Sequence, residues 1–327
     1  MSITSYFHAR DYYTELLAKI DTATSSIDMM YLAYVDGRWA RQINKILVTK
    51  VQQGVRVRLL VDTLGTFFEH LRLSPRTFKM FSHLSRQGIE VHYFRHTTNL
   101  FRCQHIKLCL IDNRQLLFGG SNIADHYLRW GDNNFSLDSQ IPSGVATIFD
   151  SIISGQIDPL LTRLPSPLFS STPAMALTIP GTVHQFETSF FELIRRSTKY
   201  LRIQTWYFWP TSKICEALVA AVARGVKVEI TISQKNRVPI VNLINYSIIK
   251  NLRRQGVLIY KWDRYYSHKK SYWNDRGDIL VGSANLDPFS LYNNWEMVLA
   301  INDPNLVERL DKNFVSDLST IHDRRQS

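Results

Sequence analysis

One sequence frame occurs twice in this chain of 327 residues, and it constrains the fold more than any other feature. The first copy is QHIKLCLIDNRQLLFGGSN at residues 104–122, and the second is SHKKSYWNDRGDILVGSAN at residues 267–285. In both copies a His is followed by Lys, Asp and Asn at 2, 7 and 17 residues downstream. Side chains alternate between the two faces of a strand, so each His and its Lys project to the same side. The repeat therefore predicts two equivalent units that each present one imidazole and one ammonium group.

The matched residues of the two copies are the first candidates for a functional site. They are His105, Lys107, Asp112 and Asn122 in the first copy, and His268, Lys270, Asp275 and Asn285 in the second. The residues ahead of each copy also correspond, because QQGVRVRLLV at 52–61 resembles ARGVKVEITI at 223–232. Internal similarity of this kind indicates a duplicated structural unit.

Hydrophobic periodicity in the first half alternates between helix and strand. It predicts helices over 12–24 and 38–53, strands over 25–34, 55–61 and 89–94, and helical turns over 64–87 that are interrupted at Pro75. Strands separated by helices favour an α/β fold with a mixed or parallel sheet. We therefore predict two similar α/β lobes, each a mixed sheet flanked by helices, related by pseudo-twofold symmetry with the active site at their interface.

The duplication also predicts domain boundaries. The N-terminal lobe is expected over 1–153 and the C-terminal lobe over 182–327, because the segment 154–181 is rich in Pro, Ser and Thr and has the composition of a linker. Within the second copy, KKSYWND is far more polar than its counterpart KLCLID. This polarity favours a wetter or an edge position for the second motif strand.

Charge and cysteine content narrow the partners and the compartment. Lys and Arg number 39 against 28 Asp and Glu, a net charge of +11 that favours either an anionic phospholipid membrane surface or nucleic acid. The three cysteines form no CxxC pair, which indicates reduced thiols. No apolar run reaches the length of about 18 residues that a membrane helix needs. We expect a cytoplasmic protein that associates peripherally with the inner face of the membrane; the sequence carries no signal for its oligomeric state.

The repeated residues match the needs of metal-free phosphodiester chemistry. One imidazole attacks phosphorus and forms a covalent phosphohistidine, while the other protonates the leaving oxygen and later deprotonates the acceptor. Lys107 and Lys270, helped by the amides of Asn122 and Asn285, would hold the phosphoryl oxygens. Cys and His residues form no cluster at zinc spacing, and no dinucleotide or P-loop motif occurs, so neither a metal nor a cofactor is expected.

An attacking imidazole needs a carboxylate that fixes its tautomer. Glu296, 28 residues beyond His268, is the predicted partner of that His. For His105 the corresponding region offers Asp132 and Asp138, and Asp138 is preferred because it lies in an alternating, strand-like segment.

Three further residues are assigned supporting roles. Asp112 and Asp275 close their strands and are interpreted as residues that bind a turn or the backbone. Ser283 is predicted to contact the phosphate, and since Gly120 occupies the equivalent position, only the second copy offers a hydroxyl there.

The two copies of HxK(x)4D(x)6GxxN resemble the signature of the phospholipase D superfamily. The segments GGSNIADHY and GSANLDPFSLYNNWE are similar to the cardiolipin synthase branch, and the resemblance extends from about Tyr6 to about Ile301. It implies a two-lobed α/β fold, a phosphatidyl-enzyme intermediate, and transfer of a phosphatidyl group to a lipid alcohol such as phosphatidylglycerol. It also implies that His105 is the nucleophile and His268 the acid and base. Phe289 departs from the family, which often has Arg at that position.

Three alternatives stay open at this level. Water could replace the lipid alcohol, which would make the chain a phospholipase D hydrolase. The charge and the 12% aromatic content also fit a nuclease of the same superfamily, with nucleic acid as its partner. A binding module without catalysis is disfavoured, because both motifs retain their His and Lys.

Overall fold

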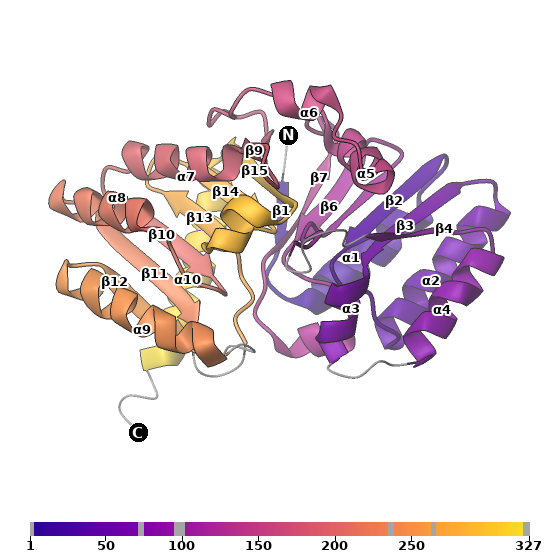
Figure 1. Ribbon diagram of the computed structural model, residues 1–327, viewed down its shortest axis with the longest axis horizontal. Coiled ribbons are helices and arrows are strands. Elements are labelled where there is room, and N and C mark those ends of the chain that lie inside the picture. Colours follow the sequence, from indigo (N-terminus) through magenta and orange to yellow (C-terminus); the bar gives the residue numbers. More distant parts are fainter. Residues whose placement is uncertain (1–2, 71–74, 95–101, 235–238, 263–265, 323–327) are drawn as a thin grey trace.

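The computed structural model describes residues 3–70, 75–94, 102–234, 239–262 and 266–322. In that part of the chain two mixed sheets lie beside each other, and helices cover the outer face of each (Figure 1). The elements of the first lobe are β1 (Ile3–Tyr6), α1 (Ala9–Asp21), β2 (Ser26–Tyr31), α2 (Arg38–Gln52), β3 (Arg56–Asp62), α3 (Thr63–His70), α4 (Pro75–Arg86), β4 (Glu90–Phe94), β5 (Leu108–Ile111), β6 (Gln115–Gly119), η1 (Asp125–Arg129), β7 (Asn134–Asp138) and α5 (Val145–Ser154).

The second lobe follows a short helix, α6 (Pro159–Arg163). Its elements are β8 (Ala174–Ile179), β9 (Val183–His184), α7 (Gln185–Arg196), β10 (Tyr200–Thr205), α8 (Ser212–Ala223), β11 (Lys227–Ser233), α9 (Pro239–Arg254), β12 (Leu258–Trp262), β13 (Ser271–Asn274), β14 (Asp278–Gly282), η2 (Phe289–Asn293), β15 (Glu296–Asn302) and α10 (Pro304–His322). The helices and strands predicted for the first half coincide with α1 to β4 to within a few residues.

The strand order shows the duplication directly. The first sheet runs β4-β3-β2-β5-β6-β7-β1, and the second repeats this order as β12-β11-β10-β13-β14-β15-β8 with β9 added at its edge. Parallel pairing joins the first three strands of each series, and antiparallel pairing joins the others. The predicted fold of two similar mixed α/β lobes is confirmed.

The connection between the lobes is shorter than the predicted linker 154–181. Its last part forms β8, which pairs with β15 through partners such as Ala176 and Val298. β8 is the second-lobe counterpart of β1 at the edge of the first sheet. Both are short strands ahead of the first long helix of their lobe, and only the pairing with a distant strand reveals them.

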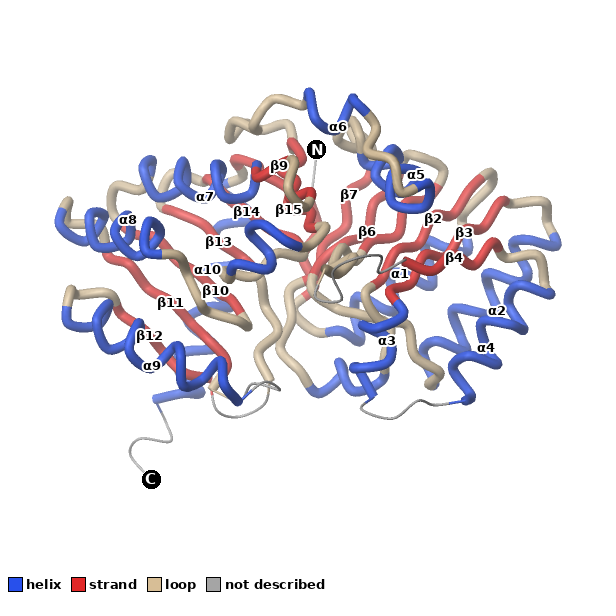
Figure 2. Tube along the Cα trace, in the orientation of Figure 1, coloured by secondary structure: helices blue, strands red, loops and turns tan. Residues whose placement is uncertain are grey.

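The two sheets face each other across a shared apolar core. Leu108 and Phe118 from the first sheet join Trp273 and Val281 from the second in one buried cluster, which α5 and α10 extend. Helices α1, α2 and α4 pack on the outer face of the first sheet, and α7, α8 and α9 pack on that of the second (Figure 2). Because the core is continuous, close packing fixes the position of one motif relative to the other.

The second motif strand is not at an edge or in a wet position, as its polarity had suggested. β13 lies between β10 and β14, and all four of its residues are buried. Its polar side chains are paired: Asn133 of the first lobe donates to Ser271 at 2.8 Å, and Asn274 donates to Asp278 at 3.2 Å. Buried polar groups are tolerated where they have partners. The polarity of the strand therefore reflects contacts with the rest of the protein rather than solvent.

The Asp residues that end the two motif strands hold neighbouring backbone. Asp112 accepts the N–H groups of Thr24, Ser25 and Ser26, each at 2.8 Å. Asp275 accepts the equivalent N–H groups of residues 198–200. Burial acts to raise the pKa of Asp112, but these hydrogen bonds outweigh it and lower the pKa. These contacts agree with the predicted backbone-binding role.

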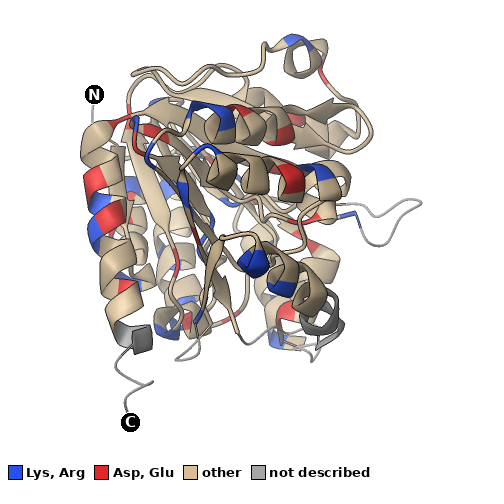
Figure 3. Ribbon diagram, turned by 90° about the vertical axis from the view of Figure 1, so that its left-hand side faces the viewer, with Lys and Arg blue, Asp and Glu red and all other residues tan. Residues whose placement is uncertain are grey.

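The surface of the second lobe carries both signs of charge. Basic and acidic residues are interspersed along the helices on the side shown in Figure 3. The excess of positive charge therefore forms no single basic stripe along these helices. Among the described residues, no helix combines the length and the apolarity needed to cross a bilayer.

Candidate active site

Each motif histidine is held by a segment of the other lobe. The backbone N–H of His105 donates to the carbonyl of Trp295 at 3.0 Å, and the N–H of His268 donates to the carbonyl of Gly131 at 2.7 Å. These hydrogen bonds belong to two short parallel bridges, one on each side of the interface. The two motifs therefore meet where the lobes meet, and the symmetry predicted from the repeat extends to the backbone around the histidines.

The carboxylates beside the two imidazoles also come from the opposite lobes. His105 Nδ1 lies 2.8 Å from Glu296, and His268 Nδ1 lies 2.9 Å from Asp132. An ionised carboxylate only accepts hydrogen bonds, so each Nδ1 carries a proton, and Nε2 is the ring nitrogen that can attack phosphorus or exchange a proton with a substrate oxygen. The site thus contains two imidazoles whose Nδ1 atoms are held by carboxylates and whose chemistry takes place at Nε2.

The carboxylate assignments made from the sequence were wrong in both lobes. Glu296 binds His105 rather than His268, and Asp138 contacts neither His, because it lies on the surface and forms an ion pair with Lys19 at 2.6 Å. The alternating pattern around Asp138 is real, but this residue ends β7. A better signal was the spacing: Asp132 follows His105 by 27 residues, close to the 28 between His268 and Glu296. The repeat identifies the two acids; only the fold shows that the pairs cross.

Lys107 and Lys270 are buried beside the imidazoles. Each Nζ donates to the carbonyl of the His two residues earlier, Lys107 at 2.5 Å and Lys270 at 2.6 Å. Burial lowers the pKa of Lys107 to about 8 and that of Lys270 to about 7. Burial also lowers the pKa of His105, and the charges of both lysines lower it further against the opposing effect of Glu296. The charges of both ammonium groups therefore act on the imidazole of His105.

The two motif asparagines are not equivalent. Asn122 donates from its amide to the hydroxyl of Tyr127 at 2.7 Å and accepts the N–H of Ala33 at 3.0 Å. Asn285 is also buried, but its Oδ1 has no hydrogen-bond partner among the described residues. The predicted role in phosphate binding therefore fits the available contacts of Asn285 better than those of Asn122, which fastens neighbouring backbone and a tyrosine.

Ser283 holds a carboxylate instead of offering a free hydroxyl to phosphate. Its Oγ donates to Glu296, which also accepts from Ser290 at 2.7 Å. In the first lobe a serine also donates to the carboxylate, because Ser121 donates to Asp132 at 3.0 Å. This serine is not at the position that corresponds to Ser283. The expectation of a single hydroxyl near the site is therefore incorrect. Both carboxylates are fixed by serine.

Gly120 occupies the position equivalent to Ser283, and the serine that binds the carboxylate in the first lobe is the next residue, Ser121. A Cβ at Gly120 would lie 2.0 Å from Oδ1 of Asp132, which no atom pair tolerates. Aspartate is one methylene shorter than the glutamate of the other lobe, and its carboxylate reaches His268 through the space that a side chain at Gly120 would fill. Glycine is required here by close approach.

We expect Gly120→Ala to displace Asp132 from His268. The variant should lower turnover by about 10-fold or more and destabilise the fold by about 1–3 kcal/mol, the usual cost of overpacking. Steady-state rates and thermal unfolding measure the two effects. Ser121→Ala is the matched control, because it removes a hydrogen bond to the same carboxylate without adding atoms. Wild-type turnover in Gly120→Ala would show that this close packing does not position Asp132.

Aromatic side chains that the sequence did not single out surround His268. The ring centroids of Trp206, Tyr127 and Trp130 lie 4.3, 5.4 and 5.9 Å from its imidazole. Trp206 also lies against Lys270, whose Nζ is 5.8 Å from the ring centroid. Aromatic walls exclude water and strengthen the electrostatic interactions inside. No pattern in the sequence marks these residues, because they come from two segments far apart in the chain, η1 with the residue after it and the loop that follows β10.

The pKa values predict a narrow pH optimum for the free enzyme. Lys270 and Lys107 lose their positive charge as the pH rises through about 7 and about 8, which weakens binding of an anionic phosphodiester. Burial raises the pKa of Asp132 to about 6, so below that pH it takes up a proton and no longer serves His268 as a carboxylate. We expect kcat/KM to fall on both sides of about pH 6–7.

The same measurement contains its own control. A bound phosphodiester stabilises both ammonium groups, so the alkaline limb should lie at higher pH in kcat than in kcat/KM. Profiles of both constants between about pH 5 and 9 test this shift. A kcat/KM that stays level to about pH 9 would contradict the lysine pKa values.

Comparison with known proteins identifies the family. The chain matches the family described as "Cardiolipin synthase, PLD-like domain" over residues 16–152 and 190–318. The chain belongs to this family. It is 25% identical to the cardiolipin synthase of Clostridium perfringens (strain SM101) over 97% of its own length and 70% of that protein. It is 27% identical to the major cardiolipin synthase of Bacillus subtilis (strain 168) over 94% of its length and 67% of that protein.

A solved structure shares the fold of this chain. The crystal structure of phosphatidylserine synthase from Haemophilus influenzae Rd KW20 superposes with a TM-score of 0.73 over 95% of this chain and 84% of that one, at 17% identity. The family match and the curated relatives confirm the resemblance to the cardiolipin synthase branch of the phospholipase D superfamily. As a cardiolipin synthase family member, the protein is a phosphatidyltransferase of that superfamily.

Proposed function

We propose that this family member transfers the phosphatidyl group of one phosphatidylglycerol molecule to the terminal hydroxyl of a second, through a covalent phosphohistidine. The observation that carries the proposal is the crossed pair of His–carboxylate contacts, His105 with Glu296 and His268 with Asp132. It leaves two Nε2 atoms and two buried ammonium groups in one interface. No metal enters the proposal, and the described residues include no group of three or more His, Cys, Asp or Glu that could hold one.

In the first step Nε2 of His105 attacks the donor phosphorus. The bond from phosphorus to the glycerol oxygen breaks, and His268 gives that oxygen its proton, so free glycerol leaves. Lys107 and Lys270 balance the charge on the two nonbridging oxygens, which grows in the transition state. The product is a phosphatidyl group bonded to nitrogen, with His268 left neutral.

In the second step the neutral His268 acts as a base. It takes the proton of the acceptor hydroxyl, whose oxygen attacks phosphorus while the phosphorus–nitrogen bond breaks. Cardiolipin forms, His105 is free again, and His268 regains the proton that it gave up. Both histidines thereby return to their starting protonation and bonding states, so the cycle needs no cofactor.

The environment of His105 supports its role as the nucleophile. A nucleophilic imidazole must be neutral, and burial together with the two lysines lowers the pKa of His105. His268 lies deeper, with 2% of its side chain exposed against 12% for His105. We also propose that the protein works at the inner face of a membrane without spanning it, because its net charge of +11 attracts it to anionic lipid headgroups.

Product analysis tests the proposal. The protein is incubated with phosphatidylglycerol vesicles and, separately, with oligonucleotides, and the products are identified by mass spectrometry. We expect cardiolipin and glycerol in equal amounts. Phosphatidic acid in place of cardiolipin would mean hydrolysis, and shortened oligonucleotides would mean a nuclease. The absence of cardiolipin in the vesicle reaction would contradict the proposed transfer.

A further inference from the structure

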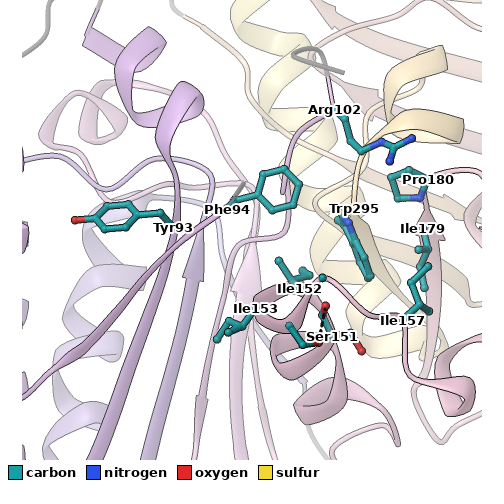
Figure 4. A pocket seen from close by; sticks show the side chains of 12 residues that line it. Tyr93, Phe94, Arg102, Ser151, Ile152, Ile153, Ile157, Ile179, Pro180 and Trp295 are labelled. Carbon is teal, nitrogen blue, oxygen red and sulfur yellow. Dashed lines mark hydrogen bonds between the residues drawn. The ribbon is translucent and has the colours of Figure 1, made fainter. Parts of the chain in front are cut away.

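A cavity of about 340 Å³ lies beside the reaction centre at the junction of the lobes. Its walls come from the ends of β4, α5 and β8, from Arg102 ahead of the first motif, and from Trp295 ahead of β15 (Figure 4). Trp295 connects this cavity to the catalytic residues. Its carbonyl accepts the N–H of His105, and the next residue is Glu296, which binds the same imidazole.

The cavity has a cationic end and an apolar end. In Figure 4 Arg102 lies at one end, Ile152 and Ile157 lie toward the other, and the ring of Trp295 stands between them. Such a lining fits an amphiphile that has an anionic group next to a hydrocarbon chain. Neither a free anion nor a nucleotide base would use both ends.

Arg102 is the unusual feature of this cavity. Its buried Nε has no hydrogen-bond partner, and no carboxylate among the described residues forms an ion pair with its guanidinium. By contrast, the guanidinium of Arg58 is neutralised by Asp28 at 2.6 Å. A buried donor without a partner is costly, which favours a bound anion at this position.

We propose that this cavity binds the acceptor lipid, with its non-reacting phosphate on Arg102 and one acyl chain along Ile152, Ile157 and Ile179. The inference rests on the proposed transfer between two phosphatidylglycerol molecules. That reaction brings two phosphates to the protein, and only the donor phosphate can occupy the space between the imidazoles and lysines. The acceptor phosphate is separated from the attacking hydroxyl by its glycerol, so it lies outside the catalytic centre and needs a second cation.

Acceptor binding can be measured separately from the earlier steps by the ratio in which the phosphatidyl-enzyme reacts with the acceptor lipid and with water. The donor is the p-nitrophenyl ester of phosphatidic acid, so that nitrophenol release counts every intermediate formed. Phosphatidylglycerol and water then compete for that intermediate, giving cardiolipin or phosphatidic acid. For Arg102→Met we expect the cardiolipin to phosphatidic acid ratio to fall by about 10-fold or more, the effect of losing a charged hydrogen bond. Nitrophenol release at saturating donor should not fall.

Three comparisons make the assignment specific. Arg114→Met removes the same charge from an exposed turn and should leave the ratio unchanged. Ile157→Phe fills the apolar end and should lower the ratio with phosphatidylglycerol. With the chain-free acceptor glycerophosphoglycerol, Arg102→Met should still lower transfer, whereas Ile157→Phe should not. Thermal unfolding confirms that each variant is folded.

The outcomes separate this inference from the proposed function. A wild-type protein that forms no cardiolipin would contradict the transfer reaction itself. An unchanged ratio in folded Arg102→Met and Ile157→Phe would overturn the acceptor site. The acceptor site would also be overturned if cardiolipin, phosphatidic acid and nitrophenol release all fell by the same factor. That result would place the donor in the cavity.

Discussion

Replacing His105 by alanine is expected to abolish the reaction before any product leaves, whereas His268→Ala is expected to stop it halfway. With the p-nitrophenyl donor the leaving phenolate needs no proton, so His268→Ala should release about one equivalent of nitrophenol and then stall for lack of a base. His105→Ala should release none. Steady-state turnover should fall by about 10⁴-fold or more in both, as for other nucleophile–base pairs.

Rapid-mixing kinetics and acid-quenched mass spectrometry measure the burst and the trapped phosphohistidine. His83→Ala is the matched control, because this histidine lies exposed in α4 and should leave both phases unchanged. A burst in His105→Ala that is missing from His268→Ala would reverse the two roles. Normal turnover in either variant would refute a mechanism with two imidazoles.

The repeated frame predicted the fold because its determinants are local. Strands, helices and glycine stops around residues 52–61 and 223–232 recur in the same order, and the topology repeats with them. The failures concern elements defined by distant partners. β8 is recognisable only beside β15, and the polar side chains of Ser271 in β13 and of Lys269 ahead of it are explained only by Asn133 and by Asn313 of α10. Local pattern carries no information about such pairing.

The residues of the candidate site also fall into those that local sequence patterns identify and those that only the fold reveals. The His and Lys residues were found because one spacing occurs twice, and the structure places both copies directly ahead of β5 and β13, in segments that meet at the interface. The partners of the imidazoles were misassigned because the sequence invites pairing within a lobe, whereas the two inter-lobe bridges bring Trp295 to His105 and Gly131 to His268. Arg102 and the aromatic residues around His268 belong to no repeated pattern in the sequence. Their roles are inferred from the structure, from the unpartnered Nε of Arg102 and from the contacts of the aromatic rings with His268.

The crossed contacts lead to the second large effect. Glu296→Gln should slow formation of the phosphohistidine, and Asp132→Asn should slow its breakdown, each by about 10²–10⁴-fold. An amide can donate to Nδ1 and so move the imidazole proton to Nε2, which blocks attack by His105 or proton uptake by His268. Asp138→Asn is the matched control: it removes a carboxylate that binds only Lys19 and should leave both steps unchanged.

The nitrophenol burst distinguishes crossed contacts from contacts within a lobe. With crossed contacts, Glu296→Gln loses the fast burst while Asp132→Asn keeps it and loses only the steady state. With contacts within a lobe, Glu296 would serve His268, and its replacement would spare the burst. Since each carboxylate reaches across the interface, the lobes have to be docked for either imidazole to be correctly protonated. The shared apolar core between the sheets is therefore a requirement of catalysis as well as of stability.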